Sequence, residues 1–145
     1  MNARWHVFYG LMIAVLLLGL IGMGRQAGAT AKPPKAELAP EEVFERLTAN
    51  PRALQVVDMR GKKEYEEGRV PGALRLSLET VEKVDRYKET IFVSDDGDRK
   101  SFREKRELVR VARNLRGGMV AWTLARLPQD TGPYDPLKAG LIRPG

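Results

Sequence analysis

One strand–loop–helix pattern near the middle of the chain constrains the fold more than any other feature. The apolar run Ile91–Val93 is typical of a buried parallel strand, and it stops at Ser94 before a short loop around Gly97. Ser101 and Glu104 then form the S-x-x-E pattern of a helix start. Ligands of α/β proteins bind where parallel strands end and helices begin. The loop is therefore the candidate functional site.

Short apolar runs alternate with helical patterns through most of the chain. The expected strands are residues 54–57, 73–76, 91–93 and 109–115. The expected helices are residues 40–50, 62–67, 78–87, 102–108 and 119–127. This alternation predicts the α/β class, with a small parallel sheet covered by helices on both faces.

The N-terminal segment, residues 1–24, predicts a membrane anchor. It contains an apolar run from Trp5 to Gly24 without a charged side chain. This length matches the roughly 20 residues that cross a bilayer as a helix, and it exceeds the apolar core of about 7–15 residues in a signal peptide. We favour a single-pass anchor with the following domain outside the cytoplasm. The alternative is cleavage near residues 27–31, which would give a secreted or periplasmic protein.

Composition divides the rest of the chain into three parts. Residues 25–38 are rich in Ala, Gly and Pro and are expected to be a linker. Residues 39–128 carry the strand and helix patterns of a folded domain. Residues 129–145 contain three prolines and are expected to form an irregular, frayed tail.

The absence of cysteine and the near absence of histidine exclude several classes of catalytic and metal site. The chain has no cysteine and a single histidine, His6. Disulfides, thiolate metal sites and cysteine nucleophiles are therefore excluded, as is histidine base catalysis in the folded domain. The net charge of +6 is concentrated in residues 99–116, which hold eight basic residues against two glutamates. The simplest interpretation of this basic segment is a solvated helix face. The alternative is a surface that faces anionic lipid or an acidic partner.

Three further motifs follow one another in a characteristic order. They are Val57-Asp58-Met59-Arg60, then Glu64-Tyr65-Glu66-Glu67-Gly68-Arg69-Val70-Pro71-Gly72-Ala73, and finally Leu115-Arg116-Gly117-Gly118 followed by Ala121-Trp122. They resemble the strand ending in D-x-R, the E-[FY]-x-x-G-H-I-P-G-A run and the L-x-G-G-x-x-A-W motif of rhodanese domains. The resemblance covers about residues 40–128, and Arg69 stands where the family has histidine.

The same resemblance defines the role of the central loop. Rhodaneses carry a persulfide on the cysteine of a C-x-x-G-x-R-S loop, and here Ser94 occupies the cysteine position. Gly97 and Arg99 match the pattern, whereas Lys100 replaces its closing serine. A serine hydroxyl is not ionised near neutral pH, and no base is present to activate it. Persulfide transfer by the family mechanism and the related cysteine-based phosphatase chemistry are therefore excluded.

Three aspartates distinguish this loop further from a thiosulfate site. In a partly desolvated pocket each should oppose an anionic ligand by on the order of 1 kcal/mol or more. A cation such as Ca²⁺ is the alternative ligand, but the spacing does not match an EF-hand, and we expect no metal. The candidate binding loop comprises Ser94, Asp95, Asp96, Gly97, Asp98, Arg99, Lys100 and Ser101.

The remaining candidate residues are expected to support this loop. By resemblance and position, Asp58 and Arg60 brace the loops, and Arg69 either lines the pocket or is solvated. Trp122 is expected in the core. Since the stretch between Ser101 and Leu115 is shorter than is usual in the family, we expect a truncated helix and a more open pocket.

Together these features predict a membrane-tethered, catalytically inactive rhodanese-like domain. It would act as a binding or regulatory module for an unidentified protein partner, with no cofactor and no nucleic acid. One alternative is an accessory component of a sulfurtransferase system, which docks a sulfur carrier without supplying the thiol. The other is a structural domain of the cell envelope without a small ligand.

Overall fold

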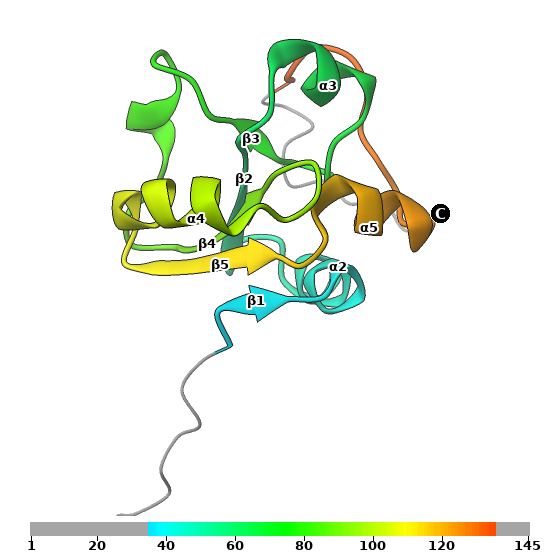
Figure 1. Cartoon of the computed structure of the whole chain (residues 1–145), viewed down its shortest axis with the longest axis horizontal. Helices are drawn as coiled ribbons and strands as arrows, with labels where there is room; N and C mark the ends of the chain where they lie inside the picture. Colours follow the sequence, from blue (N-terminus) through cyan, green and yellow to red (C-terminus); the bar gives the residue numbers. More distant parts are fainter. Residues whose placement is uncertain (1–34, 136–145) are drawn as a thin grey trace, which may run out of the picture. The chain divides into compact units, whose positions relative to one another are not determined.

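The fold is built on one parallel sheet, seen in a computed structural model that describes residues 35–135 (Figure 1). The strand order is β1-β5-β4-β2-β3, and every pairing is parallel. The strands are β1 (Glu37–Leu38), β2 (Leu54–Asp58), β3 (Leu74–Arg75), β4 (Glu89–Val93) and β5 (Val111–Leu115). The predicted parallel α/β architecture is confirmed.

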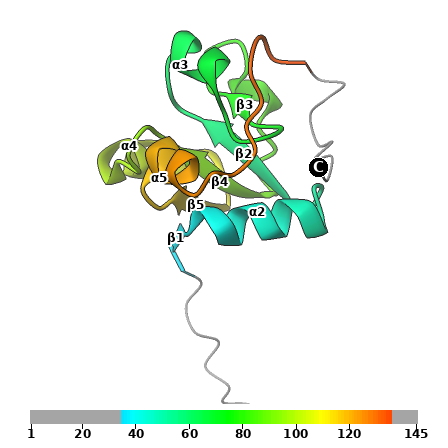
Figure 2. The same cartoon turned by 90° about the vertical axis from the view of Figure 1, so that its right-hand side faces the viewer.

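Four α-helices and two short 3₁₀ turns are described between and after these strands (Figure 1 and Figure 2). The helices are α2 (Pro40–Ala49), α3 (Lys62–Glu67), α4 (Arg99–Lys105) and α5 (Gly118–Leu124), and the turns are η1 (Val81–Lys83) and η2 (Arg106–Leu108). The helix α4 has only seven residues and passes directly into η2. The expected short helix after the loop is therefore present, although it starts earlier than predicted.

Each face of the sheet has its own apolar core, because neighbouring side chains on a strand point to opposite faces. On one face Val56 and Ile91 pack in the same cluster as residues of α2 and α5, including the fully buried Trp122. On the other face Phe92 packs in a cluster with Phe102 of α4. Helices thus cover both faces, and Trp122 is a core residue as expected.

The predicted linker extends too far into the domain. Glu37 and Leu38 form β1 and pair with Asn114 and Leu115 of β5. Leu38 is buried, and its carbonyl accepts a hydrogen bond from the N–H of Arg116 at 2.8 Å. A two-residue edge strand has no periodicity that a sequence pattern would reveal.

The helix predicted over residues 78–87 is also wrong. Only the single turn η1 is present there, and Leu78 is 95% exposed. The Thr80 hydroxyl accepts a hydrogen bond from the N–H of Ser77 at 2.9 Å and donates to the carbonyl of Arg75. Such local side-chain bonds to the backbone compete with helix formation.

The predicted membrane anchor, residues 1–24, lies outside the described residues. Between residues 35 and 135, none of the helices combines the length and the apolar character that a bilayer span requires.

Candidate functional site

The candidate loop connects β4, in the middle of the sheet, to α4. Ser94 follows the last residue of β4 directly and is 9% exposed. Its Oγ accepts a hydrogen bond from the backbone N–H of Asp98 across the loop, at 2.8 Å. The predicted strand–loop–helix arrangement is present, with the serine at the carboxyl end of a central strand.

Helix α4 begins at the loop, but its cap is not the one predicted. Asp98, rather than Ser101, is the N-cap residue. The Asp98 carboxylate accepts hydrogen bonds from the N–H groups of Lys100 at 2.9 Å and Ser101 at 3.0 Å, and from the Ser101 hydroxyl at 2.6 Å. These bonds, with the Ser101 hydroxyl first, lower the pKa of Asp98 to about 2. Asp is among the preferred N-cap residues, because its side-chain oxygens accept hydrogen bonds from N–H groups of the first turn.

This cap changes what the helix start offers to a ligand. The N–H of Phe102 donates to the Asp98 carbonyl, so three consecutive N–H groups of the first turn of α4 bind Asp98. Free N–H groups at a helix N-terminus are what attracts phosphate or sulfate. Here the protein's own carboxylate occupies two of them, and its negative charge lies where an anion would bind.

The outer side of the loop is fixed to the start of α5. The carbonyls of Ser94 and Asp95 accept hydrogen bonds from the N–H groups of Met119 and Val120, both at 2.9 Å. Gly118 has a φ of +57°, and a Cβ there would collide with the carbonyl of Ser94. The paired glycines of the sequence motif thus allow α5 to lie directly against the loop.

The centre of the loop packs closely against the end of β5 and the glycine that follows it. Gly97 has a φ of +81°, and a Cβ at this position would lie 2.6 Å from the backbone nitrogen of Gly117. The Gly97 carbonyl accepts a hydrogen bond from Nδ2 of the buried Asn114 at 2.9 Å. The glycine in the loop pattern is therefore required by packing as well as by its backbone conformation.

Asp58 and Arg60 connect the loop to β2 and α3. Asp58 is completely buried, and the Arg60 guanidinium donates to its two carboxylate oxygens, at 3.0 Å from Nε and 2.7 Å from Nη2. The same Nη2 donates to the carbonyl of Gly68, and Nη1 lies 3.8 Å from the exposed carboxylate of Asp95. The structure thus brings Asp58, Arg60 and the loop together, with the guanidinium engaged in internal bonds.

Three charged residues of the loop pattern point outward. Asp96, Arg99 and Lys100 are exposed. The Arg99 guanidinium binds Glu37 of β1 at 2.8 Å, and this hydrogen bond is the main reason why the pKa of Glu37 is lowered. The one arginine of the family pattern therefore pairs with an edge strand.

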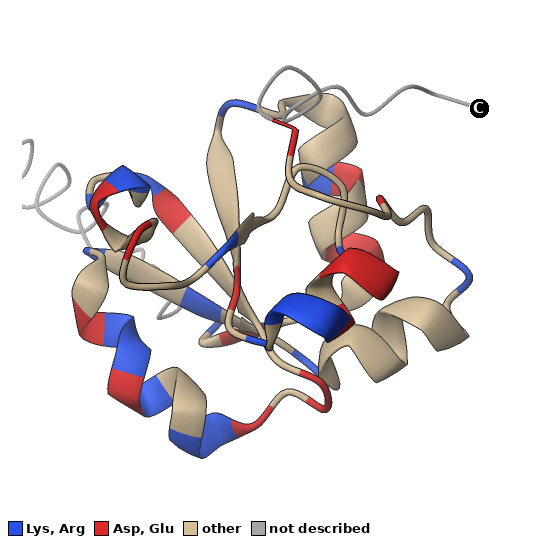
Figure 3. Ribbon diagram, turned by 90° about the horizontal axis from the view of Figure 1, so that it is seen from above, with Lys and Arg blue, Asp and Glu red and all other residues tan. Residues whose placement is uncertain are grey.

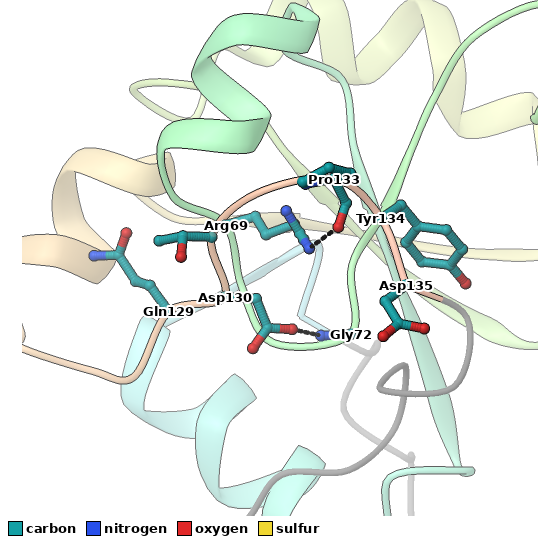
Figure 4. A pocket seen from close by; sticks show the side chains of 8 residues that line it. Arg69, Gly72, Gln129, Asp130, Pro133, Tyr134 and Asp135 are labelled. Atoms are coloured by element: carbon teal, nitrogen blue, oxygen red, sulfur yellow. Dashed lines mark hydrogen bonds between the residues drawn. The ribbon is translucent and has the colours of Figure 1, made fainter.

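Arg69 lies apart from the loop and is neither solvated nor a part of it. Its side chain is 4% exposed and lies over the ring of Tyr65, 4.4 Å from the centroid. Its guanidinium donates to the carbonyl of Gly132 at 2.5 Å. It also donates to the carbonyl of Pro133 at 3.3 Å, the bond drawn in Figure 4. Burial raises the pKa of Tyr65 to about 12.

These bonds fix a C-terminal segment that the sequence predicts to be frayed. It has no regular structure, but the backbones of Arg69 and Asp130 form two hydrogen bonds of 3.0 Å in an isolated antiparallel bridge. The Asp130 carboxylate also accepts from the N–H of Gly72 at 3.0 Å (Figure 4). In Figure 1 and Figure 2 the orange segment leaves α5 and runs toward α3. A polar cavity of about 270 Å³ lies beside it, lined by Arg69 and Tyr134 among others.

A second concave surface, which the sequence patterns did not indicate, adjoins the loop. It is an open groove of about 460 Å³ between α3, α5 and Asp95. Glu64 and Glu67 of α3 and Val120 and Leu124 of α5 line it. Figure 3 shows the uncharged α5 beside the charged helix α3 and the acidic loop that precedes α4. Among residues 35–135, no group of three or more His, Cys, Asp or Glu side chains is arranged to hold a metal ion.

Comparison with known proteins agrees with this geometry. The model of the rhodanese-like domain matches residues 39–125, more than half of the chain. The chain belongs to the rhodanese-like domain family. As a member without cysteine, it has Ser94 at the position of the family's nucleophile. The family match ends before the segment that Arg69 holds. No curated protein matches the chain significantly.

Solved rhodanese structures share the fold at low sequence identity. A thiosulfate sulfurtransferase from Pseudomonas aeruginosa is 22% identical, with a TM-score of 0.58, over 70% of this chain and 20% of that one. A 3-mercaptopyruvate sulfotransferase from Escherichia coli is 17% identical, with a TM-score of 0.59, over 70% of this chain and 53% of that one. A rhodanese-like domain protein from Staphylococcus aureus is 24% identical, with a TM-score of 0.50, over 59% of this chain and 89% of that one. This chain thus spans a fifth of the Pseudomonas enzyme and about half of the E. coli enzyme.

Proposed function

We propose that this chain is a membrane-tethered, catalytically inactive rhodanese-like domain that binds a partner protein. The observation that carries the proposal is the state of the loop. The nucleophile position holds Ser94, and the first turn of α4 donates to Asp98 in place of an external anion. Because the rhodanese fold is complete while its loop lacks a nucleophile, binding is the function that this domain supports best.

The lack of a thiol supports the loss of catalysis. Sulfur transfer requires a nucleophile that accepts a sulfur atom and releases it again, which a thiolate does and a serine hydroxyl does not. The only histidine, His6, precedes the domain, so Ser94 has no imidazole base within the fold. The same two facts oppose phosphate-ester hydrolysis through a covalent intermediate.

The rigid surroundings of the loop support a role in recognition. Its backbone is bonded to α5 through Ser94 and Asp95, and to β5 through Gly97. Arg60 links it to β2 and α3. A surface held by so many internal bonds loses little conformational freedom on binding, which favours affinity.

Crosslinking in native membranes tests the proposal. The full chain, carrying an affinity tag after Gly145, is crosslinked in its own cells, and the attached proteins are identified. We expect a defined partner in the membrane fraction. Absence of any specific partner would overturn the proposal. A topology reporter fused at the same position tests the orientation, for which we expect the domain outside the cytoplasm.

A further inference from the structure

The open groove beside the loop is lined by an apolar stripe. Val120 and Leu124 lie one turn apart on the same side of α5 and are 55% and 78% exposed. Residues at this spacing are neighbours on a helix surface. Met119, which is buried, contributes to the lining beneath them. Neither exposed side chain is needed for the core, which α5 joins through Met119 and Trp122.

The charges of the groove have one predominant sign. Glu64 and Glu67 extend from α3, and Asp95 extends from the loop. Among the described residues that line the groove, Arg60 is the one cation. It donates to the buried carboxylate of Asp58, so that pair is neutral as a unit, and its Nη1 lies 3.8 Å from Asp95. Lys63 lies 3.9 Å from Glu67, but both side chains are mostly exposed, and such pairs contribute little. The apolar stripe therefore lies beside three carboxylates.

This combination selects one class of ligand. We infer that the groove binds a basic amphipathic helix of another protein, with apolar side chains on Val120 and Leu124 and lysine or arginine near Glu64, Glu67 and Asp95. Apolar side chains at a helical spacing are how such segments dock into grooves. Opposite charge on the rim guides association and selects against acidic partners. The inference rests on the proposed function and names the chemistry of the partner.

The same charges oppose the other classes of ligand. Nucleic acid and anionic lipid would meet the carboxylates of Glu64, Glu67 and Asp95. A second copy of the chain could reach the groove only by presenting a basic segment, and this occupant is included in the test below.

Two synthetic peptides of about 15 residues, long enough to form a helix on binding, serve as probes. One consists of leucine and lysine at helical spacing, and in the other each lysine is replaced by glutamate. The full chain is held in nanodiscs of zwitterionic phosphatidylcholine, and binding is measured by fluorescence anisotropy, with empty nanodiscs as reference. We expect the lysine peptide to bind at least tenfold more tightly than the glutamate peptide.

Two variants assign this binding to the groove. Leu124→Asp should weaken the lysine peptide at least tenfold. The double variant Glu64→Lys, Glu67→Lys should remove the preference for lysine over glutamate. Both act on exposed side chains, so circular dichroism should be unchanged. The matched controls are Leu78→Asp and Glu79→Lys, at exposed positions outside the groove, and they should leave binding unaltered.

Several outcomes would overturn the inference. These are equal binding of the two peptides, an equal loss from Leu78→Asp, or no loss from Leu124→Asp. Self-association of the full chain that Leu124→Asp abolishes would assign the groove to a second copy. If native-membrane crosslinks persist in Leu124→Asp, the domain binds its partner elsewhere and the proposed function stands. If the wild-type chain gives no crosslinks, the proposed function itself fails.

Discussion

The loop at Ser94 and the groove beside it share Asp95 but differ in how their polar and apolar groups are used. Inside the loop, the hydroxyl of Ser94 and the carboxylate of Asp98 accept the backbone N–H groups that a ligand would require. In the groove, Val120 and Leu124 are left exposed beside three carboxylates. The polar groups of the loop at the family's active-site position are therefore bonded within the protein. The adjoining groove instead exposes apolar and acidic side chains that a partner can contact.

The largest expected effect comes from the arginine that joins these two regions. Arg60→Met leaves the buried Asp58 carboxylate without its partner, which typically costs about 3–5 kcal/mol. We expect a loss of this size in the free energy of unfolding, measured by urea denaturation. The control is Asp95→Asn, which removes only a 3.8 Å contact of an exposed carboxylate and should change stability by less than about 1 kcal/mol. If Arg60→Met lowered the free energy of unfolding no more than Asp95→Asn does, the Arg60–Asp58 pair would not be what braces the loop.

The C-terminal segment gives the next effect. Arg69→His installs the residue that the resemblance expects, but imidazole cannot reach the carbonyls of both Gly132 and Pro133. Hydrogen bonds to charged groups contribute about 1.5–3 kcal/mol, so we expect a loss of about 2 kcal/mol. Faster proteolysis after residue 128 should accompany it. The exposed Arg116→His serves as the control. An unchanged cleavage rate would contradict the role of Arg69 in holding the segment.

Placing a thiol at position 94 tests whether the aspartates of the loop also oppose sulfur transfer. Ser94→Cys should have little sulfurtransferase activity, because three nearby aspartates oppose both thiosulfate and a thiolate. Replacing Asp95, Asp96 and Asp98 by asparagine in the same variant should raise turnover at least about tenfold, equivalent to about 1.4 kcal/mol. Asparagine also caps helices well, so α4 should persist. Full activity of Ser94→Cys alone would show that only the nucleophile was lost.

The smallest effect concerns the cap of α4. Asp98→Ala should lower the melting temperature more than Asp96→Ala does, since only Asp98 receives the N–H groups of the first turn. The pKa of Asp98 is lowered from 3.8 to about 2 in the folded chain. Its stabilisation is therefore fully present above pH 4 and disappears as the pH falls toward 2. The difference between wild type and Asp98→Asn in denaturation curves should follow that window; a difference independent of pH would contradict it.

The sequence allowed the main framework to be predicted for a physical reason. Buried strands such as β2 and β4 are continuous apolar runs, and the glycines at 97, 117 and 118 mark places where two backbones approach closely. The order of these features identifies the family and its loop. The spacing of the loop pattern also places Ser94 directly after a central strand.

What could not be predicted depends on contacts between distant residues or on competition between nearby ones. Arg69 binds residues 132 and 133, more than sixty positions away, and no local pattern indicates this. Asp98 and Ser101 are both residues that cap helices well, so the sequence alone does not decide between them, and in the structure Asp98 is the cap. The groove requires α3, α5 and the loop to be placed together, so its apolar and acidic residues form no motif in the sequence.

The most direct test of the central claim is sulfur transfer from thiosulfate to cyanide by the purified full chain. We expect no turnover above buffer, because neither Ser94 nor any other residue of the chain supplies a thiol. Ser94→Ala should behave in the same way. Clear turnover by the wild-type chain that disappears in Ser94→Ala would contradict the loss of catalysis, since it would make the serine a working nucleophile.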